Sequence, residues 1–350
     1  MGTTSPWRRS CWVLVAAFGL IPLGCGGGDD DGMPAPPDAD PEEGPVVAPE
    51  GPFFPAGSTF YTDMSDAPLR DDSADIIAAI DAAGGWGGPQ EQLRVDFSLE
   101  VLAGNENTPL LAFTPTDDHY TPDCDIEDVP VPTGGALEAE TGYECAGDGE
   151  CHLLVAHAPS NKLYEMWRAD ISDGTFRGGC LAVWDMTQDY GLEGRGANCA
   201  TADTAGLPIA PLTFSATEVA SGEIDHALRF VLPGDRIREG FYVPPATHTS
   251  ASATGGADTP PFGTWLRLRD DFDESEMGEG AQVVVRAMKQ YGIILADGGE
   301  VTLTAQSDRF TPERWEGLLG TDELDEILIT DFEVIDTGDP VAYEEGCDRL

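Results

Sequence analysis

The sequence is poor in basic residues. Its 350 residues include 18 Lys and Arg against 64 Asp and Glu, and the formal net charge is −46 at pH 7. Only Lys162 and Lys289 are lysines. A chain this anionic is repelled by phosphate backbones and by anionic bilayers. We therefore expect no nucleic-acid partner, no binding to a bare anionic membrane surface, and a soluble monomeric domain.

The N-terminal apolar stretch, Cys11–Leu23, is too short to be a comfortable membrane span. It follows Arg8 and Arg9 and has the length of a signal peptide. The next residues, Leu23-Gly24-Cys25, resemble a bacterial lipobox, although Pro22 departs from the usual pattern. We expect a signal peptide over residues 1–24, a lipid on Cys25, and a cell-envelope location in the outer membrane. The alternatives are an ordinary signal peptide cut nearby and twin-arginine export.

The cysteines lack any C-x-x-C spacing, which argues against structural zinc. If Cys11 leaves with the signal peptide and Cys25 carries lipid, six cysteines remain: Cys124, Cys145, Cys151, Cys180, Cys199 and Cys347. An even number in an exported chain predicts three disulfides, with fifteen possible pairings.

Common catalytic signatures are also absent. There is no G-x-S-x-G, no H-E-x-x-H and no phosphate-binding glycine loop. No serine has a motif around it that favours Ser/His/Asp catalysis. Candidate site residues must therefore come from polar side chains placed on predicted strands.

Residues 25–52 form a linker rich in Gly, Pro, Asp and Glu, which has too few apolar residues to bury. Residues 53–350 are expected to form a single β-rich domain outside the cytoplasm. Helices are predicted over residues 72–83, 280–291 and 311–319. Strands are predicted over 93–102, 152–156, 162–168, 181–186, 224–232, 241–243 and 265–268, and residues 293–296 and 301–305 are predicted to pair as a hairpin. This pattern favours a mainly β fold, an antiparallel, jelly-roll-like β-sandwich with a few short peripheral helices.

Four ordered segments carry a resemblance. They are HALRF at residues 226–230, YVPPATH at 242–248, PPFG with LRL at 260–268, and KQYGIILADG at 289–298. They resemble the running motifs of a family of uncharacterised, secreted bacterial proteins found alongside polysaccharide-associated modules. The resemblance spans roughly residues 150 to 335. It implies one exported domain and brings no established activity.

The best candidate catalytic group consists of His226, Arg229, Tyr242 and His248. Period two places His226 in an apolar stripe with Leu228 and Phe230. It is therefore either a core histidine or a residue on a concave, sugar-binding face. His248 follows two prolines near a strand end, where functional residues are frequent.

Trp265, Arg267 and Arg269 share a face of a predicted strand. They either pair with carboxylates or form a cationic, aromatic patch for a sugar. Together with His or Tyr, such a patch would suit a polysaccharide lyase, in which Arg neutralises a uronate carboxylate.

Glycoside hydrolysis would instead require two carboxylates. Glu165 and Asp185 are the candidates because each shares a predicted face with apolar residues, and Trp167 shares the face of Glu165; Asp225, also on a predicted strand, is weaker. No resident cofactor or metal is expected, although the acidic loop of residues 270–274 offers oxygen ligands for calcium. The sequence therefore favours a lipoprotein that binds or cleaves an extracellular polysaccharide, by lyase-like or hydrolase chemistry. The alternative is a non-catalytic structural or adhesive envelope lipoprotein.

Overall fold

The computed structural model describes residues 46–350, apart from residues 89–90 and 148. The chain divides into a unit of residues 1–38 and a unit of residues 39–350. The predicted signal peptide, Cys25 and most of the linker lie outside the described residues. Within the second unit, the Ala48 N–H donates to Phe310 O and the Ala103 N–H donates to Val47 O, both at 2.9 Å. The folded domain therefore begins before Phe53, the predicted boundary.

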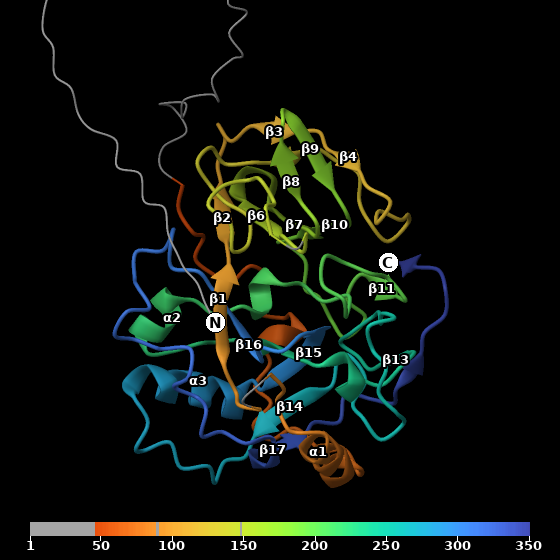
Figure 1. Cartoon of the computed structure of the whole chain (residues 1–350), viewed down its shortest axis with the longest axis vertical. Helices are drawn as coiled ribbons and strands as arrows, with labels where there is room; N and C mark the ends of the chain where they lie inside the picture. The colour runs from red at the N-terminus through yellow and green to blue at the C-terminus, as the bar shows by residue number, and fades with distance from the viewer. Residues whose placement is uncertain (1–45, 89–90, 148) are drawn as a thin grey trace, which may run out of the picture. The chain divides into compact units, whose positions relative to one another are not determined.

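A six-stranded sheet forms the centre of the larger part of the domain (Figure 1). Across the sheet its strands are β1 (Val95–Leu99), β16 (Leu303–Gln306), β12 (Leu228–Leu232), β15 (Ile293–Gly298), β14 (Trp265–Leu268) and β17 (Phe332–Val334). All of β12 and most of β15 are buried. Apart from Arg229 in β12, residues 228–232 and 293–296 are apolar runs, which is typical of strands covered on both faces.

The helices are α1 (Ser73–Ala82), α2 (Ala216–Ser221) and α3 (Glu279–Gln290). The helices predicted over residues 72–83 and 280–291 are confirmed to within one residue at each end. α1 packs on β17 through buried Ile76, Ile77 and Ile80, and α3 packs on β14. Short 3₁₀ turns are η1 (Thr59–Tyr61), η2 (Ala158–Ser160), η3 (Ala210–Leu212), η4 (Gly234–Arg236) and η5 (Ile329–Asp331).

Two local predictions near the C-terminus are wrong. β15 and β16 do not form a hairpin, because β12 lies between them, parallel to β15 and antiparallel to β16. Residues 311–319 form turns and no helix. There the Asp308 carboxylate accepts the Trp315 N–H at 2.8 Å, and Gly317, within a turn, adopts a φ of +82°, outside the right-handed helical region.

A four-stranded sheet forms the centre of the smaller part of the domain. Its order is β10 (Leu181–Asp185), β7 (Lys162–Met166), β6 (Leu153–His157) and β2 (Val101–Gly104). β1 and β2 come from one predicted strand, which is interrupted at Glu100. The chain thus passes directly from the larger sheet to the smaller one (Figure 1).

Both faces of the smaller sheet are buried. Leu154 and Leu163 belong to the large core that surrounds the six-stranded sheet, whereas Leu153 and Tyr164 belong to a separate, smaller core. The remaining strands are β3 (Leu110–Leu111), β4 (Thr114–Pro115), β5 (Val129–Pro130), β8 (Asp170–Ser172), β9 (Thr175–Gly178), β11 (Gly196–Ala197), β13 (Phe241–Tyr242), β18 (Val341–Ala342) and β19 (Asp348–Arg349).

The predicted mainly β fold with a few short helices is confirmed. Strand pairing is mixed: β1 with β16, β12 with β15, β2 with β6 and β4 with β9 are parallel, and the other strand pairs described are antiparallel. Parallel neighbours require long connections rather than tight turns. This is why the local turn signals do not reveal the order of the strands.

Three disulfides cross-link the domain, as the even number of cysteines predicts. They join Cys124 to Cys180, Cys145 to Cys151, and Cys199 to Cys347. Disulfides persist in oxidising compartments, so they indicate an extracytoplasmic location. Within residues 46–350, as far as they are described, no helix has the length and apolarity of a membrane span.

Candidate functional site

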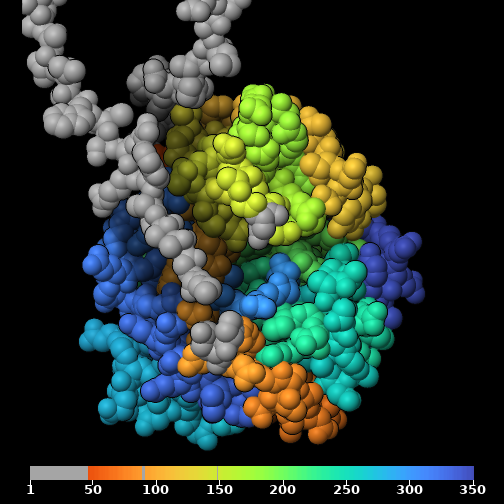
Figure 2. Space-filling view, in the orientation of Figure 1, coloured from red at the N-terminus to blue at the C-terminus, as the bar shows by residue number. Residues whose placement is uncertain are grey.

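A cleft of about 620 Å³ lies where the six-stranded sheet meets residues of the smaller part of the domain. Asp96, Arg229, Thr304 and Asp297 line it from β1, β12, β16 and β15. Further lining residues come from outside that sheet: Glu138, Glu150, His152, Trp167, residues 200–204 and His248. Figure 2 shows the surface set back between the yellow-green residues and the blue and cyan ones. Ten of its lining side chains are titratable, more than in any of three other pockets of the domain.

One wall of the cleft is the loop of residues 202–204. Three side chains from other parts of the chain each bind one of these consecutive residues. His152 Nε2 donates to Ala202 O at 3.1 Å. Arg229 Nε donates to Asp203 Oδ2 at 2.7 Å. His248 Nδ1 donates to Thr204 O at 3.0 Å. Three strands or loops that are remote in sequence thus fix this short segment.

Arg229 is the centre of a buried ion-pair network. Besides Asp203, its guanidinium donates to Asp297 Oδ2 at 3.1 Å and to Thr304 Oγ1 at 3.2 Å. Although burial opposes its charge, the two carboxylates raise the pKa of Arg229, so it stays charged. Burial raises the pKa of Asp203 to about 6, which leaves this carboxyl ionised at pH 7. Arg229 therefore acts as a structural counter-ion beneath the cleft.

Glu138 and His152 form a second ion pair. His152 Nδ1 lies 2.6 Å from Glu138 Oε2, and both ring nitrogens face acceptors. Despite the opposing effect of burial, Glu138 raises the pKa of His152 to about 9. Burial acts against ionisation of Glu138 too, but the His152 charge holds the pKa of Glu138 below its usual range. At neutral pH the pair is an imidazolium and a carboxylate.

Ser98 links this pair to Asp96. Its hydroxyl lies 2.9 Å from Asp96 Oδ2 and 3.3 Å from Glu138 Oε1. Burial, with a smaller contribution from the Glu138 charge, raises the pKa of Asp96. Two neighbouring carboxyl groups thus have pKa values shifted in opposite directions, which is the arrangement that acid–base catalysis uses.

His248 lies at the cleft in a different protonation state from His152. Burial lowers the pKa of His248, so the ring is neutral at pH 7. Because Nδ1 donates to Thr204 O, Nε2 carries the lone pair. The rings of His248 and Tyr343 pack in a T-shaped arrangement, with 5.0 Å between ring centroids.

The four predicted catalytic residues do not form one group. Arg229 and His248 line the cleft, but His226 lines a separate pocket and lies 3.1 Å from Glu218 Oε1. Its Nδ1 donates to Ala227 O at 2.8 Å, so both ring nitrogens have structural partners. Tyr242 is buried, and its hydroxyl donates to Asn198 Oδ1 at 3.4 Å. The interpretation of these four residues as a single catalytic site is therefore incorrect.

The proposed cationic, aromatic patch is also absent. Trp265 is fully buried and donates its Nε1–H to Tyr291 O at 2.7 Å. Arg267 pairs with Glu333 at 2.5 Å and donates to backbone carbonyls. Arg269 pairs with Asp271 at 3.3 Å and lies 3.6 Å from Asp331. The arginines stabilise the strand ends and do not offer free charge to a sugar.

Glu165 and Asp185 lie outside the cleft. Glu165 is completely buried and accepts from the backbone N–H groups of Ile209 and Ala210 and from Trp184 Nε1–H. Burial raises the pKa of Glu165 to about 7, so this carboxyl titrates near neutrality while anchoring η3. Asp185 is exposed and accepts from Thr187. Of the predicted binding residues, only Trp167 lines the cleft, and its Nε1 donates to Glu150 at 2.8 Å.

The acidic loop considered for calcium surrounds a lysine instead. Lys289 Nζ donates to Asp270 O at 3.3 Å, to Phe272 O at 2.7 Å and to Glu274 Oε2 at 2.7 Å. These oxygens are the ones that a bound cation would use. The ammonium group occupies this position, so the loop does not support a calcium site.

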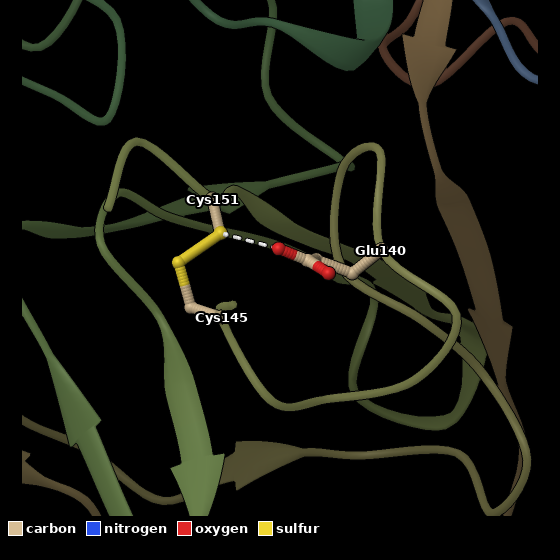
Figure 3. A group of neighbouring side chains, drawn as sticks. All are labelled: Glu140, Cys145 and Cys151. Carbon is tan, nitrogen blue, oxygen red and sulfur yellow. Dashed lines mark hydrogen bonds between the residues drawn. A yellow bond between two sulfur atoms is a disulfide. The ribbon is translucent and has the colours of Figure 1, made fainter. Parts of the chain in front are cut away.

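One side-chain cluster within the described residues has the spacing of a metal site: Glu140, Cys145 and Cys151. Figure 3 shows that the two sulfurs are joined to each other. Metal ligation requires thiolates, which a disulfide lacks. Glu140 Oε1 accepts the N–H groups of Ala146 and Gly147 at 2.9 Å, and thereby supports the short loop closed by this disulfide.

Sequence reasoning missed most of the cleft. Asp96, Glu138, His152, Asp203 and Asp297 converge from separate segments, and no spacing motif joins them. The one sequence signal for these cleft residues is a charged residue within a largely apolar predicted strand. Asp96 and Arg229 both have this signal. No protein-family model, curated protein or solved structure matches the chain.

Proposed function

We propose that this chain is a lipid-anchored envelope protein that binds an extracellular, neutral polysaccharide in the cleft around Asp96, Glu138 and Trp167. The observation that carries the proposal is a sizeable polar cleft with an aromatic side chain in its wall. Ligand sites combine apolar or aromatic surface with a few converging polar groups. Carboxylates, hydroxyls and backbone groups suit the hydroxyls of a sugar.

The charge of the cleft favours a neutral sugar over a uronate. Its acidic lining residues include Asp96, Glu138, Glu150, Asp297 and Glu300. Arg229 is already paired with two carboxylates, and His152 is paired with Glu138. An anionic polymer would meet repulsion without a free cation to offset it. The lyase chemistry considered from the sequence is therefore the less favoured alternative.

Trp167→Ala is expected to weaken binding of neutral polysaccharide by at least about tenfold, because aromatic anchors carry much of the binding energy at such sites. The measurement is affinity electrophoresis of the full chain across a panel of neutral and uronate-containing polymers. Tyr291→Ala is the matched control, since Tyr291 lines the separate His226 pocket. Equal loss in both variants, or binding of uronate polymers alone, would contradict the proposal.

The anchor and the outer-membrane location rest on the sequence around Cys25, and the resemblance to secreted bacterial proteins supports the same setting. A lipid on Cys25 would hold an anionic domain near a membrane that otherwise repels it. Metabolic labelling with a palmitate analogue is expected to mark the wild type and not Cys25→Ser. Equal labelling of the two would exclude the anchor.

A non-catalytic structural or adhesive role is the second candidate. It is favoured by the observation that His226, Tyr242, Trp265, Arg267 and Arg269 are all engaged in internal contacts. On this account the chain acts as a monomeric envelope protein without a nucleic-acid partner. It predicts no specific polysaccharide binding in the panel described above.

A further inference from the structure

Asp96 and Glu138 approach the cleft from different parts of the domain. Asp96 lies on β1, where its backbone is in register with Thr304 of β16. Glu138 lies in the loop before β6, and its N–H donates to His152 O at 3.0 Å. Both carboxyl groups are half-buried and line the cleft. Each therefore has a fixed backbone and a side chain that a ligand can reach.

The spacing of these carboxyl groups is set by Ser98. One hydroxyl lies within hydrogen-bonding distance of both, at 2.9 and 3.3 Å. The separation of the two bonded oxygens, Asp96 Oδ2 and Glu138 Oε1, cannot exceed these two distances laid end to end, and is therefore shorter than the roughly 6.5–9.5 Å of inverting glycosidases, which hold a water between the two groups. It is compatible with the roughly 5–5.5 Å of retaining enzymes, in which one carboxylate attacks the sugar directly.

We propose that Asp96 and Glu138 are the acid–base and nucleophile pair of a retaining glycoside hydrolase, acting on the neutral polysaccharide that the cleft binds. This inference rests on the proposed function. The environments assign the roles. Asp96 sits in a partly desolvated site beside another carboxylate, which favours its protonated form. The His152 imidazolium contacts Glu138 Oε2 and holds this carboxyl group ionised. The other carboxylate oxygen, Oε1, faces Ser98.

The reaction balances with water as the only co-reactant. A Glu138 oxygen forms a bond to the anomeric carbon while the glycosidic C–O bond breaks, and Asp96 gives its proton to the leaving oxygen. Asp96, now a carboxylate, then takes a proton from water as the water oxygen attacks the anomeric carbon. The Glu138–sugar bond breaks, both carboxyl groups return to their starting states, and the anomeric configuration is retained.

The test uses the full chain and the neutral polysaccharide that it binds most tightly. We expect the wild type to release new reducing ends, and early proton NMR spectra to show the anomer of the substrate. Asp96→Asn and Glu138→Gln are each expected to lower the rate by at least about a hundredfold. Asp185→Asn is the matched control, because that carboxylate is exposed and does not line the cleft, and its rate is expected to equal that of the wild type.

Covalent labelling of the nucleophile in the wild type tests the assignment without variants, which could fail to fold. A 2-deoxy-2-fluoro glycoside of the same sugar, with an activated leaving group, is expected to add one sugar mass to the peptide that contains Glu138. Binding without new reducing ends, inverted products, or a label on another residue would overturn this inference and leave the proposed binding function standing. If no neutral polysaccharide binds, both are overturned.

Discussion

Replacing Arg229 by Met is expected to lower the free energy of unfolding by about 3–5 kcal/mol. The substitution removes the guanidinium that neutralises Asp203, whose side chain is completely buried, and Asp297. A buried carboxylate that loses its partner keeps its desolvation penalty, and no ion pair offsets this cost. Urea unfolding of the full chain, followed by tryptophan fluorescence, measures the change.

Two further variants make this prediction specific. Arg94→Met removes an exposed ion pair to Asp322, and we expect it to cost less than about 1 kcal/mol. Asp203→Asn added to Arg229→Met should recover part of the lost stability, because it removes the unpaired charge. A cost for Arg229→Met as small as that for Arg94→Met would contradict the buried-network account.

The domain is expected to be less stable at pH 9 than at pH 5. The pKa of buried Glu165 is raised from 4.5 to about 7, and that of His152 from 6.5 to about 9. The folded state holds both protons more tightly than the unfolded chain does. The Glu165 contribution is complete below pH 4.5 and is lost as the pH rises through 7. The His152 contribution is complete below pH 6.5 and is lost as the pH rises through 9.

Each group is expected to lower the free energy of unfolding by on the order of 3 kcal/mol across its window. Urea unfolding at pH 5, 7 and 9 measures the two steps separately. Glu165→Gln should reduce the change between pH 5 and 7, to which Asp203, with its pKa raised to about 6, also contributes, and His152→Gln should reduce the change between pH 7 and 9. Below about pH 4 the stability is expected to fall again as the pH decreases. Carboxyl groups with lowered pKa values, such as Glu138 and Glu218, then become protonated and lose their ion pairs with histidines. Equal stability at pH 5 and pH 9 would contradict these assignments.

The elements that could be predicted from the sequence are those with strong local signals. The helices at residues 73–82 and 279–290 have apolar periodicity and glycines after their ends, and β6 and β10 of the smaller sheet are short, mostly apolar runs. The hairpin prediction fails because β12, about 60 residues earlier in the chain, inserts between β15 and β16. Such long-range pairing leaves no trace in a local turn signal.

The candidate site was less predictable, for a physical reason. Arg229 and His248, two of the four predicted catalytic residues, both line the cleft. His226 has the same sequence signature, yet its ring bridges Glu218 and Ala227 O in another pocket. A polar residue in an apolar stripe signals burial with a partner, and only the tertiary structure shows whether that partner is a neighbouring residue or a ligand.

The most direct test of the proposed binding site is a crystal structure of the full chain with the neutral oligosaccharide that it binds most tightly. We expect sugar density in the cleft, beside Trp167 and within hydrogen-bonding distance of Asp96 and Glu138. Sugar density in the His226 pocket or elsewhere on the domain, with the Asp96–Glu138 cleft free of sugar, would contradict it.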